Sequence, residues 1–185
     1  MTLSRACLLC LPVFVAAPAR AQLGELQVGV IGAYGRGEAR GAGGGLVLGV
    51  AAGRLAYVGL RWTYYAGDTR LRGPTPSEVR TRTQVVAMDL GIQIPVGALE
   101  IVPGVTVGWN QFTQRARQPD ASGSSSEFLA APGIAVEMRV ARIAIIPEIQ
   151  YLLAGAPNLP WRVDHRGLAA SVRLVYLSEL RRIRR

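Results

Sequence analysis

Residues 84–109, QVVAMDLGIQIPVGALEIVPGVTVGW, decide the fold of this chain. Every second residue of the first arm is apolar: Val86, Met88, Leu90, Ile92 and Ile94. The residues between them are mostly small or polar, and after a turn at 95–97 the alternation resumes and runs to Trp109. Because successive side chains of a strand point to opposite faces, the pattern predicts a β-hairpin with one apolar face. Each arm approaches the roughly 9–11 residues that a tilted strand needs to cross the hydrocarbon of a membrane.

The same alternation recurs along the chain and predicts eight strands: 25–35, 43–52, 55–66, the two arms of 84–109, 127–140, 142–154 and 164–178. Tight turns at 52–54, at 95–98 and near Ala141 alternate with longer polar loops at 36–42, 67–78, 113–126 and 155–163. Short turns at one end and long loops at the other are typical of outer-membrane barrels. We therefore predict an all-β fold, an eight-stranded antiparallel up-and-down transmembrane β-barrel.

The two ends of the chain differ from this pattern. Residues 1–21 combine Arg5, an apolar run at 6–17 and a final Ala-Arg-Ala, which predicts a cleavable secretory signal peptide. Cys7 and Cys10 both lie inside it, so neither a disulfide nor a thiolate metal site is expected in the exported protein. The barrel is expected over 22–180 and a basic tail over 181–185. No later run of about 18 apolar residues predicts a membrane-spanning helix.

The second face of each strand carries glycine and scattered polar or charged residues. An eight-stranded barrel has an interior just wide enough for side chains to fill, which favours this composition inside and the apolar rows outside. A soluble sandwich or a lipocalin-type barrel is the alternative and would be built the other way round. The charged residues expected in the lumen are Arg61, Asp89, Glu100, Glu137, Arg139, Glu148 and Arg173.

Counting along the strands brings Arg61 near Asp89 and Glu148 near Arg173, while Glu100, Glu137 and Arg139 gather towards the periplasmic end. Buried charges must be paired, because breaking such a pair costs roughly 3–5 kcal/mol. Our hypothesis is that these ions hold the lumen shut and leave no wide pore.

Aromatic residues fall near strand ends, where Trp and Tyr suit the membrane–water boundary. Aromatics of a sandwich core would instead occupy mid-strand positions. The predicted interface aromatics are Tyr34, Trp62, Tyr64, Trp109, Phe128 and Tyr151 near the long loops, with Tyr176 at the opposite end.

Residues 131–152, APGIAVEMRVARIAIIPEIQYL, resemble the penultimate hairpin of small OmpA-like outer-membrane barrel domains. The matching positions are Gly133, Glu137, Glu148 and Tyr151. The resemblance implies the fold and says little about the role of the chain.

Two features depart from that family. Pro103, Pro132 and Pro147 fall inside expected strands, where each removes a ladder donor, so we expect β-bulges there. The family usually ends on an aromatic residue that the barrel-insertion machinery reads. This chain ends in a basic tail, and Tyr176 is the candidate for that role.

All 21 basic residues are arginine, and the formal net charge is +9. A guanidinium grips phosphate through a planar fork, so loop arginines are candidates to contact anionic lipid headgroups or acidic extracellular glycans. The candidates are Arg70, Arg72, Arg115, Arg117 and Arg162; an ordinary solvated loop surface is the alternative. Expected partners are outer-membrane lipid, lipopolysaccharide and the insertion machinery, with no nucleic acid. We expect a monomer in the outer membrane of a Gram-negative-type bacterium, with periplasmic termini and extracellular long loops.

Catalysis is the less favoured alternative. Some outer-membrane barrels of this size modify lipid A with a His and a Ser near the outer rim. Here His165 and Ser171 are too far apart along a strand to hydrogen-bond, and the serines of 122–126 would reach His165 only through loop folding. No cofactor or metal motif is present in the sequence. The favoured interpretation is a structural or surface-interaction role, and a narrow conduit for small apolar molecules is the remaining alternative.

Overall fold

The structure is a computed structural model that describes residues 23–52, 55–72, 77–116 and 121–179. The predicted signal peptide and basic tail lie outside these ranges, as does Arg117. Within the described residues, no helix has both the length and the apolar character needed to cross a membrane.

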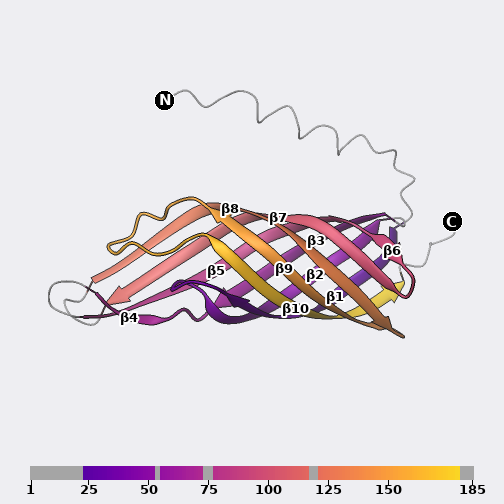
Figure 1. Ribbon diagram of the computed structural model, residues 1–185, viewed down its shortest axis with the longest axis horizontal. Coiled ribbons are helices and arrows are strands. Elements are labelled where there is room, and N and C mark those ends of the chain that lie inside the picture. Colours follow the sequence, from indigo (N-terminus) through magenta and orange to yellow (C-terminus); the bar gives the residue numbers. More distant parts are fainter. Residues whose placement is uncertain (1–22, 53–54, 73–76, 117–120, 180–185) are drawn as a thin grey trace, which may run out of the picture.

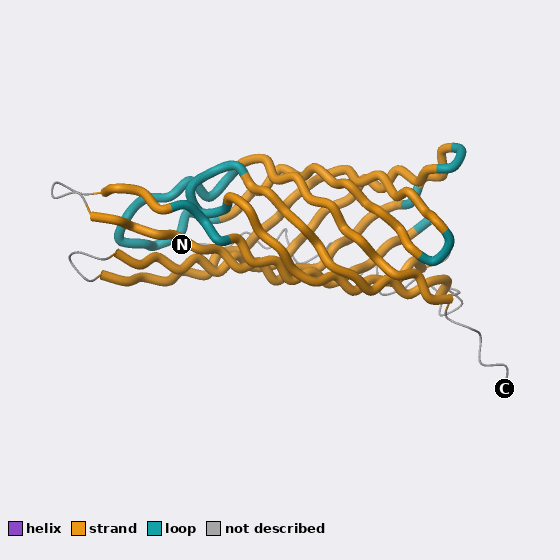
Figure 2. Tube along the Cα trace, turned by 90° about the horizontal axis from the view of Figure 1, so that it is seen from below, coloured by secondary structure: helices purple, strands orange, loops and turns teal. Residues whose placement is uncertain are grey.

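Eight long strands of the described chain form one closed antiparallel barrel (Figures 1 and 2). Each strand pairs with the next along the chain, β5 pairs with β7, and β10 pairs back to β1. The strands are β1 Leu23–Gly35, β2 Gly41–Ala52, β3 Ala56–Tyr65, β5 Ser77–Ile92, β7 Leu99–Ala116, β8 Ala121–Val140, β9 Ile143–Ala154 and β10 Gly167–Glu179. The predicted all-β, eight-stranded up-and-down barrel is confirmed.

Two short strands continue the barrel wall at its ends. β4, Thr69–Arg72, pairs with the start of β5 beyond the end of β3, and β6, Ile94–Val96, pairs with the start of β7. The connections at one end of the barrel are short and those at the other end are longer, and we call these the short-turn end and the loop end (Figure 2).

Three strands are longer at the loop end than the sequence predicted. Residues 77–83, 113–116 and 121–126 were expected in loops or before a strand, yet they belong to β5, β7 and β8. In β5 the side chains still alternate there, with Thr81 and Thr83 buried and Arg80 and Arg82 exposed. Apart from Val79, both faces of this segment are polar, so hydrophobic alternation gave no signal, although the backbone ladder continues.

The apolar rows face outward, and the charged residues predicted for the lumen lie at inward positions of their strands. Leu46, Leu60 and Val86 are each more than half exposed, whereas Arg61 and Asp89 are nearly fully buried. An apolar exterior around a polar interior is the reverse of a soluble sandwich or a lipocalin-type barrel. This arrangement leaves a continuous apolar surface on the outer wall.

The three in-strand prolines do not shift the pairing register, so the expected bulges at these positions are wrong. β7 and β8 keep one register from Leu99–Met138 to Ala116–Ala121, across Pro103 and Pro132. The β8–β9 ladder passes from Ala135–Glu148 to Met138–Ile145 in an unchanged register, skipping two pairs, one of which would include Pro147. Each proline lacks the backbone N–H that would donate to the ladder. The hydrogen bonds of the residues around it still hold the pairing register on both sides. A register shift does occur between β1 and β2, near Leu23 and Glu25.

Candidate functional site

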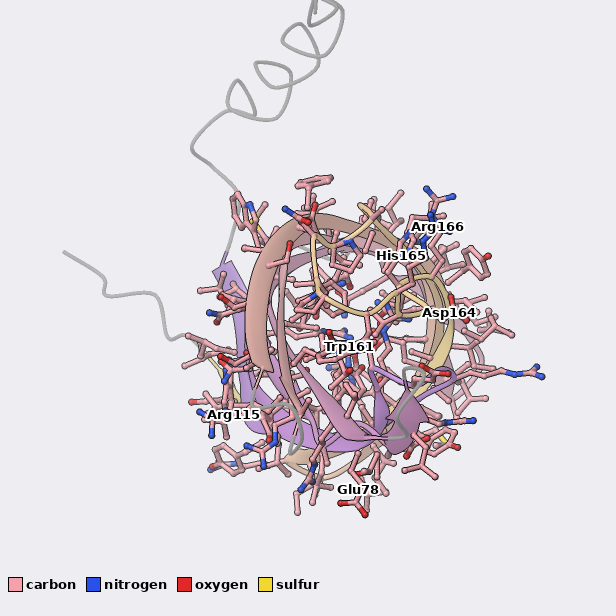
Figure 3. All side chains as sticks on the ribbon, turned by 90° about the vertical axis from the view of Figure 1, so that its left-hand side faces the viewer. Glu78, Arg115, Trp161, Asp164, His165 and Arg166 are labelled. Atoms are coloured by element: carbon pink, nitrogen blue, oxygen red, sulfur yellow. The ribbon has the colours of Figure 1, made fainter. Side chains whose placement is uncertain are left out.

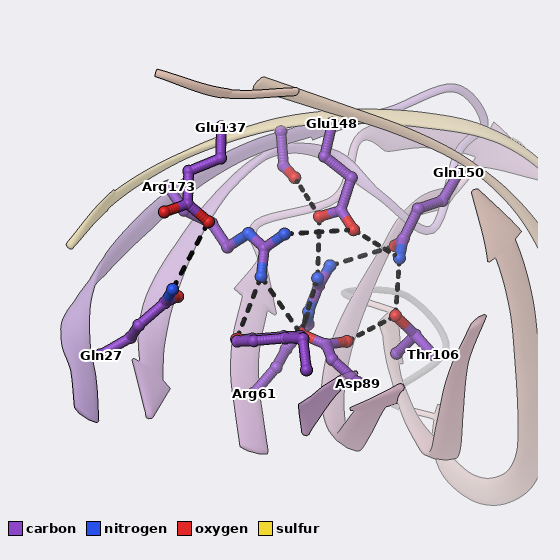
Figure 4. A network of polar contacts seen from close by, with 10 residues as sticks. Gln27, Arg61, Asp89, Thr106, Glu137, Glu148, Gln150 and Arg173 are labelled. Carbon is purple, nitrogen blue, oxygen red and sulfur yellow. Dashed lines mark hydrogen bonds and ion pairs between the residues drawn. The ribbon is translucent and has the colours of Figure 1, made fainter. Parts of the chain in front are cut away.

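The centre of the lumen is organised by Arg61 of β3 (Figure 4). Its guanidinium donates to Asp89 Oδ2 of β5 at 2.9 Å and to Glu148 Oε2 of β9 at 2.7 Å. A third bond, 3.0 Å long, runs to Gln150 Oε1. Because all four side chains are buried, each of these bonds acts in a medium of low dielectric constant.

Arg173 of β10 supplies a second guanidinium to the same two carboxylates. Its Nη1 lies 3.7 Å from Asp89 Oδ2, and its Nη2 lies 3.8 Å from Glu148 Oε1. It also donates to the Tyr57 hydroxyl at 3.2 Å, and its Cζ lies 5.5 Å from the centroid of that ring. Two arginines thus face two carboxylates, so this central network is formally neutral.

Neutral polar side chains complete the hydrogen bonds of the carboxylates. Thr106 donates to Asp89 Oδ1 at 2.5 Å, and Ser171 donates to Glu148 Oε2 at 3.1 Å. Gln150 donates in turn to Thr106 Oγ1 at 2.6 Å. A cavity of about 20 Å³ lies beside this network, which is space for about one water molecule.

Glycines on the lumen face make room for the Tyr57 ring. A Cβ atom added at Gly49 or at Gly59 would lie 2.5 Å from the Tyr57 hydroxyl oxygen. The glycine-rich lumen therefore has a specific packing reason here: an aromatic side chain lies over two positions that cannot carry a larger residue.

A second charged cluster lies towards the short-turn end. Arg139 of β8 contacts Glu25 Oε2 at 2.7 Å, Glu100 Oε2 at 3.2 Å and Glu137 Oε1 at 2.6 Å. Gln27 donates to Glu137 at 3.5 Å. One arginine thus joins β1, β7 and β8, and its three carboxylate partners leave this end of the lumen acidic.

At the loop end, connecting segments fold over the mouth of the barrel. Gln114 of β7 exchanges two hydrogen bonds with the Trp161 backbone, to its carbonyl at 3.1 Å and from its N–H at 3.0 Å. Viewed along the barrel from this end, Trp161 lies over the middle of the opening (Figure 3). Arg40, which is fully buried, donates to the His165 carbonyl at 2.6 Å. Burial lowers the pKa of the Arg40 guanidinium, and Tyr65 and Asp164 act in the opposite direction.

The structure places the predicted interface aromatics on the outer wall. Trp62, Val86, Trp109 and Phe128 form one cross-strand row, and the Trp109 and Phe128 rings meet edge to face at 6.4 Å. Tyr64 is partly buried, and the other six are between 43% and 64% exposed: Tyr34, Trp62, Trp109, Phe128, Tyr151 and Tyr176.

The described arginines expected to contact headgroups come from three parts of the barrel: β4, β7 and the connection between β9 and β10. Arg70 of β4 lies 4.0 Å from Glu38, Arg72 ends β4, and Arg162 is exposed in the connection between β9 and β10. Arg115 is on β7 rather than in a loop, and its side chain is exposed on the outer wall.

No catalytic arrangement is formed by the two residues considered for one. His165 precedes β10 with Nδ1 3.4 Å from the Val163 carbonyl, whereas the Ser171 hydroxyl donates to Glu148. The serines expected in a loop at 122–126 belong to β8. Within the described ranges, no group of His, Cys, Asp and Glu side chains is placed to hold a metal ion.

Sequence reasoning missed several contributors to these contacts, among them Tyr57, Glu25, Arg40, Gln114 and Trp161. Tyr57 and Glu25 sit at inward positions of their strands, so strict alternation could have found them. Arg40 and Trp161 belong to connections whose course depends on loop folding, and no pattern in the sequence indicates their contacts.

Comparisons with known proteins give structural matches alone. No family model and no curated protein sequence matches the chain. A major outer membrane protein from Thermus thermophilus is 14% identical with a TM-score of 0.65, covering 83% of this chain and 99% of that one. Neisserial surface protein A is 10% identical with a TM-score of 0.54, covering 84% and 96% of the two chains. The N-terminal β-barrel domain of Pseudomonas aeruginosa OprF is 10% identical with a TM-score of 0.53, covering 84% and 98%.

Each of these solved chains is a small outer-membrane barrel, and the match covers 96–99% of its length. The chain therefore has the fold of the small eight-stranded outer-membrane β-barrels.

Proposed function

We propose that this protein is an integral outer-membrane β-barrel with a lumen closed by paired charges, and that its role is structural or in surface contacts. The observation that carries the proposal is the apolar outer wall, where Leu60 is 59% exposed while its chain neighbour Arg61 is 6% exposed. In water such a wall would be an extensive exposed apolar patch, whereas in a membrane it is solvated by lipid.

The proposed orientation has the short-turn end and both termini in the periplasm and the loop end outside. Outer-membrane lipid and lipopolysaccharide then surround the wall, and the barrel acts as a monomer. The insertion machinery would read Tyr176, which is 49% exposed on the last strand. Exposed loop arginines such as Arg162 would meet acidic glycans.

Two features support a closed lumen over a conduit for small apolar molecules. The central network crosses the barrel from β3 to β9 through Arg61 and Glu148, and charged groups so placed would reject apolar solutes. The Gln114–Trp161 contact holds a segment over the loop-end mouth.

The proposal is tested by refolding residues 22–185 into detergent and then into planar bilayers. We expect the folded protein to migrate differently on a gel before and after boiling, and bilayers containing it to stay at baseline conductance. Free solubility of the folded chain without detergent would overturn the membrane location. Stable conductance steps would instead favour the conduit.

A further inference from the structure

Three arginines gather on the outer wall, outside the lumen and below the loops. Arg80 and Arg82 of β5 and Arg115 of β7 line one pocket of about 210 Å³. Its remaining walls are the side chains of Tyr64, Gln84 and Thr113. The pocket opens sideways from the barrel, because all three arginines are exposed at outward positions of their strands.

The strand register fixes how close these charges are. Arg80 pairs directly with Arg115, and Arg82 pairs with Thr113 on the same face. Like charges directly opposite each other in an antiparallel pair destabilise a sheet. The fold itself therefore gains nothing from this arrangement, and a bound anion would remove its repulsion.

Acidic side chains of the described residues leave this cluster without an ion pair. No ion pair within the described residues involves Arg80, Arg82 or Arg115, and Arg80 Nε donates only weakly to the Ala66 carbonyl at 3.4 Å. Glu78 lies two residues from Arg80 on the same face of β5, but it has a partner of its own.

The height of the pocket matches a lipid headgroup. Arg82 lies four residues beyond Val86, which pairs with Trp109 in the outer aromatic row. At about 3.3 Å per residue and a strand tilt of about 40°, this is about 10 Å along the barrel axis. Arginine side chains lean along apolar surface while keeping the charge in water, so the three guanidiniums reach the layer just above that row.

We propose that Arg80, Arg82 and Arg115 form a binding site for the phosphorylated sugar headgroup of an outer-leaflet lipid, an inference that rests on the membrane location proposed above. Guanidinium forks bind phosphate oxygens in bidentate fashion. Tyr64, Gln84 and Thr113 add neutral hydrogen-bonding groups suited to sugar hydroxyls. The sideways opening selects a ligand held in the membrane plane over a solute arriving from above.

The test compares two triple variants with equal loss of charge, refolded from residues 22–185 in detergent micelles. The wall variant carries Arg80→Gln, Arg82→Gln and Arg115→Gln. The loop variant carries Arg36→Gln, Arg142→Gln and Arg166→Gln, all exposed, all outside the pocket and none among the headgroup candidates. Native mass spectrometry then measures retention of bisphosphorylated lipid A, of its dephosphorylated form, and of the bisphosphorylated form in competition with inorganic phosphate.

We expect the wall variant to lose about tenfold or more in affinity for bisphosphorylated lipid A, and the loop variant to change less than about twofold. Dephosphorylated lipid A should bind wild type and both variants alike. An equal loss of lipid A affinity in the two variants would mean that only net charge matters, and it would overturn the proposed site. Displacement by inorganic phosphate at a concentration similar to that of the lipid would overturn the lipid headgroup as its ligand.

Urea unfolding and heat-modifiable migration report on folding separately from lipid binding. Removing opposed like charges should leave the wall variant at least as resistant to urea as wild type, with unchanged heat-modifiable migration. If wild type inserts into membranes but shows no preference for the phosphorylated lipid, this inference fails while the proposed function stands. If wild type fails to insert, the proposed function fails first. The single change Arg80→Gln, which removes one of the two opposed charges, gives the same comparison with less perturbation.

Discussion

Arg61 is the residue on which the lumen depends most. It donates to Asp89, Glu148 and Gln150, whereas Arg173 reaches the same two carboxylates only at 3.7 and 3.8 Å. Removing one partner of a buried ion pair leaves the other charge without compensation.

We expect Arg61→Met to lower the free energy of unfolding by about 3–5 kcal/mol. Arg173→Met should cost less, because its carboxylate contacts are longer. Urea unfolding in micelles, followed by tryptophan fluorescence, measures both. Arg162→Met, an exposed loop position, is the control and should change stability little. A larger effect of Arg173→Met than of Arg61→Met would contradict this ranking.

Ala141 has an unfavourable backbone conformation in the two-residue turn between β8 and β9. Its φ is 55°, a left-handed value that costs a residue with a Cβ roughly 1–2 kcal/mol. Ala141→Gly should therefore raise the free energy of unfolding by about 1 kcal/mol, measured in the same urea titration.

The matched control is Ala98→Gly, which lies in the turn between β6 and β7 next to Gly97 at φ 63°. Ala98 is exposed and its φ is not positive, so a glycine there only increases the conformational entropy of the unfolded chain. It should lower stability by about 0.4–1 kcal/mol. Equal effects at the two positions would show that the φ of Ala141 carries no strain.

At the scale of elements, the connection between β9 and β10 is held in place by β7. Its Trp161 backbone makes two hydrogen bonds to the buried Gln114 side chain. Arg162 follows immediately in the chain. Release of this contact should therefore let the backbone at Arg162 unfold locally and enter the active site of trypsin.

We expect Gln114→Leu to speed tryptic cleavage after Arg162 by about tenfold, since two hydrogen bonds no longer oppose local opening. Peptide mapping of the folded protein over time gives the rate. Gln111→Leu changes an exposed residue of the same strand and should leave the rate unaltered. Equal cleavage of all three proteins would mean that Gln114 does not hold the connection.

Hydrophobic alternation predicts a strand only where one face is apolar and the other is small or polar. Most strands of this barrel have that contrast, so the sequence predicted them. β9 was expected at 142–154 and lies at Ile143–Ala154, where the contrast is strong. β8 was expected from 127, yet it begins at Ala121, because Ser122, Ser124 and their neighbours offer no such contrast. The charged residues of the central network were predicted because they fall at the inward positions of the strand alternation. Their partners in loops, such as Arg40, follow from tertiary folding that periodicity does not encode.

At the scale of the whole molecule, closure of the barrel depends on the seam between β1 and β10. Val30 pairs with Leu174 across it. Directly opposite residues lie about 4.5–5.5 Å apart between Cα atoms, which is within the range of a disulfide. The chain from residue 22 onward has no cysteine, so an engineered pair is unambiguous.

We expect the double variant Val30→Cys, Leu174→Cys to form an internal disulfide on oxidation after refolding. The linked chain should then migrate anomalously on a non-reducing gel even after boiling. Val30→Cys with Ile149→Cys, which do not pair with each other in the barrel, should give no such species. If the Val30–Ile149 pair formed the disulfide and the Val30–Leu174 pair did not, the closed strand order would be contradicted.

The charged clusters also constrain how the molecule is assembled. Arg61 and Glu148 are 87 residues apart, and Arg139 and Glu25 are 114 apart. Arg61–Asp89, Arg173–Glu148 and Arg139–Glu100 join strands that pair directly, whereas Arg61–Glu148 and Arg139–Glu25 form only when the sheet curls. The charge clusters are therefore complete only once the first and last strands meet, which disfavours a half-curled intermediate.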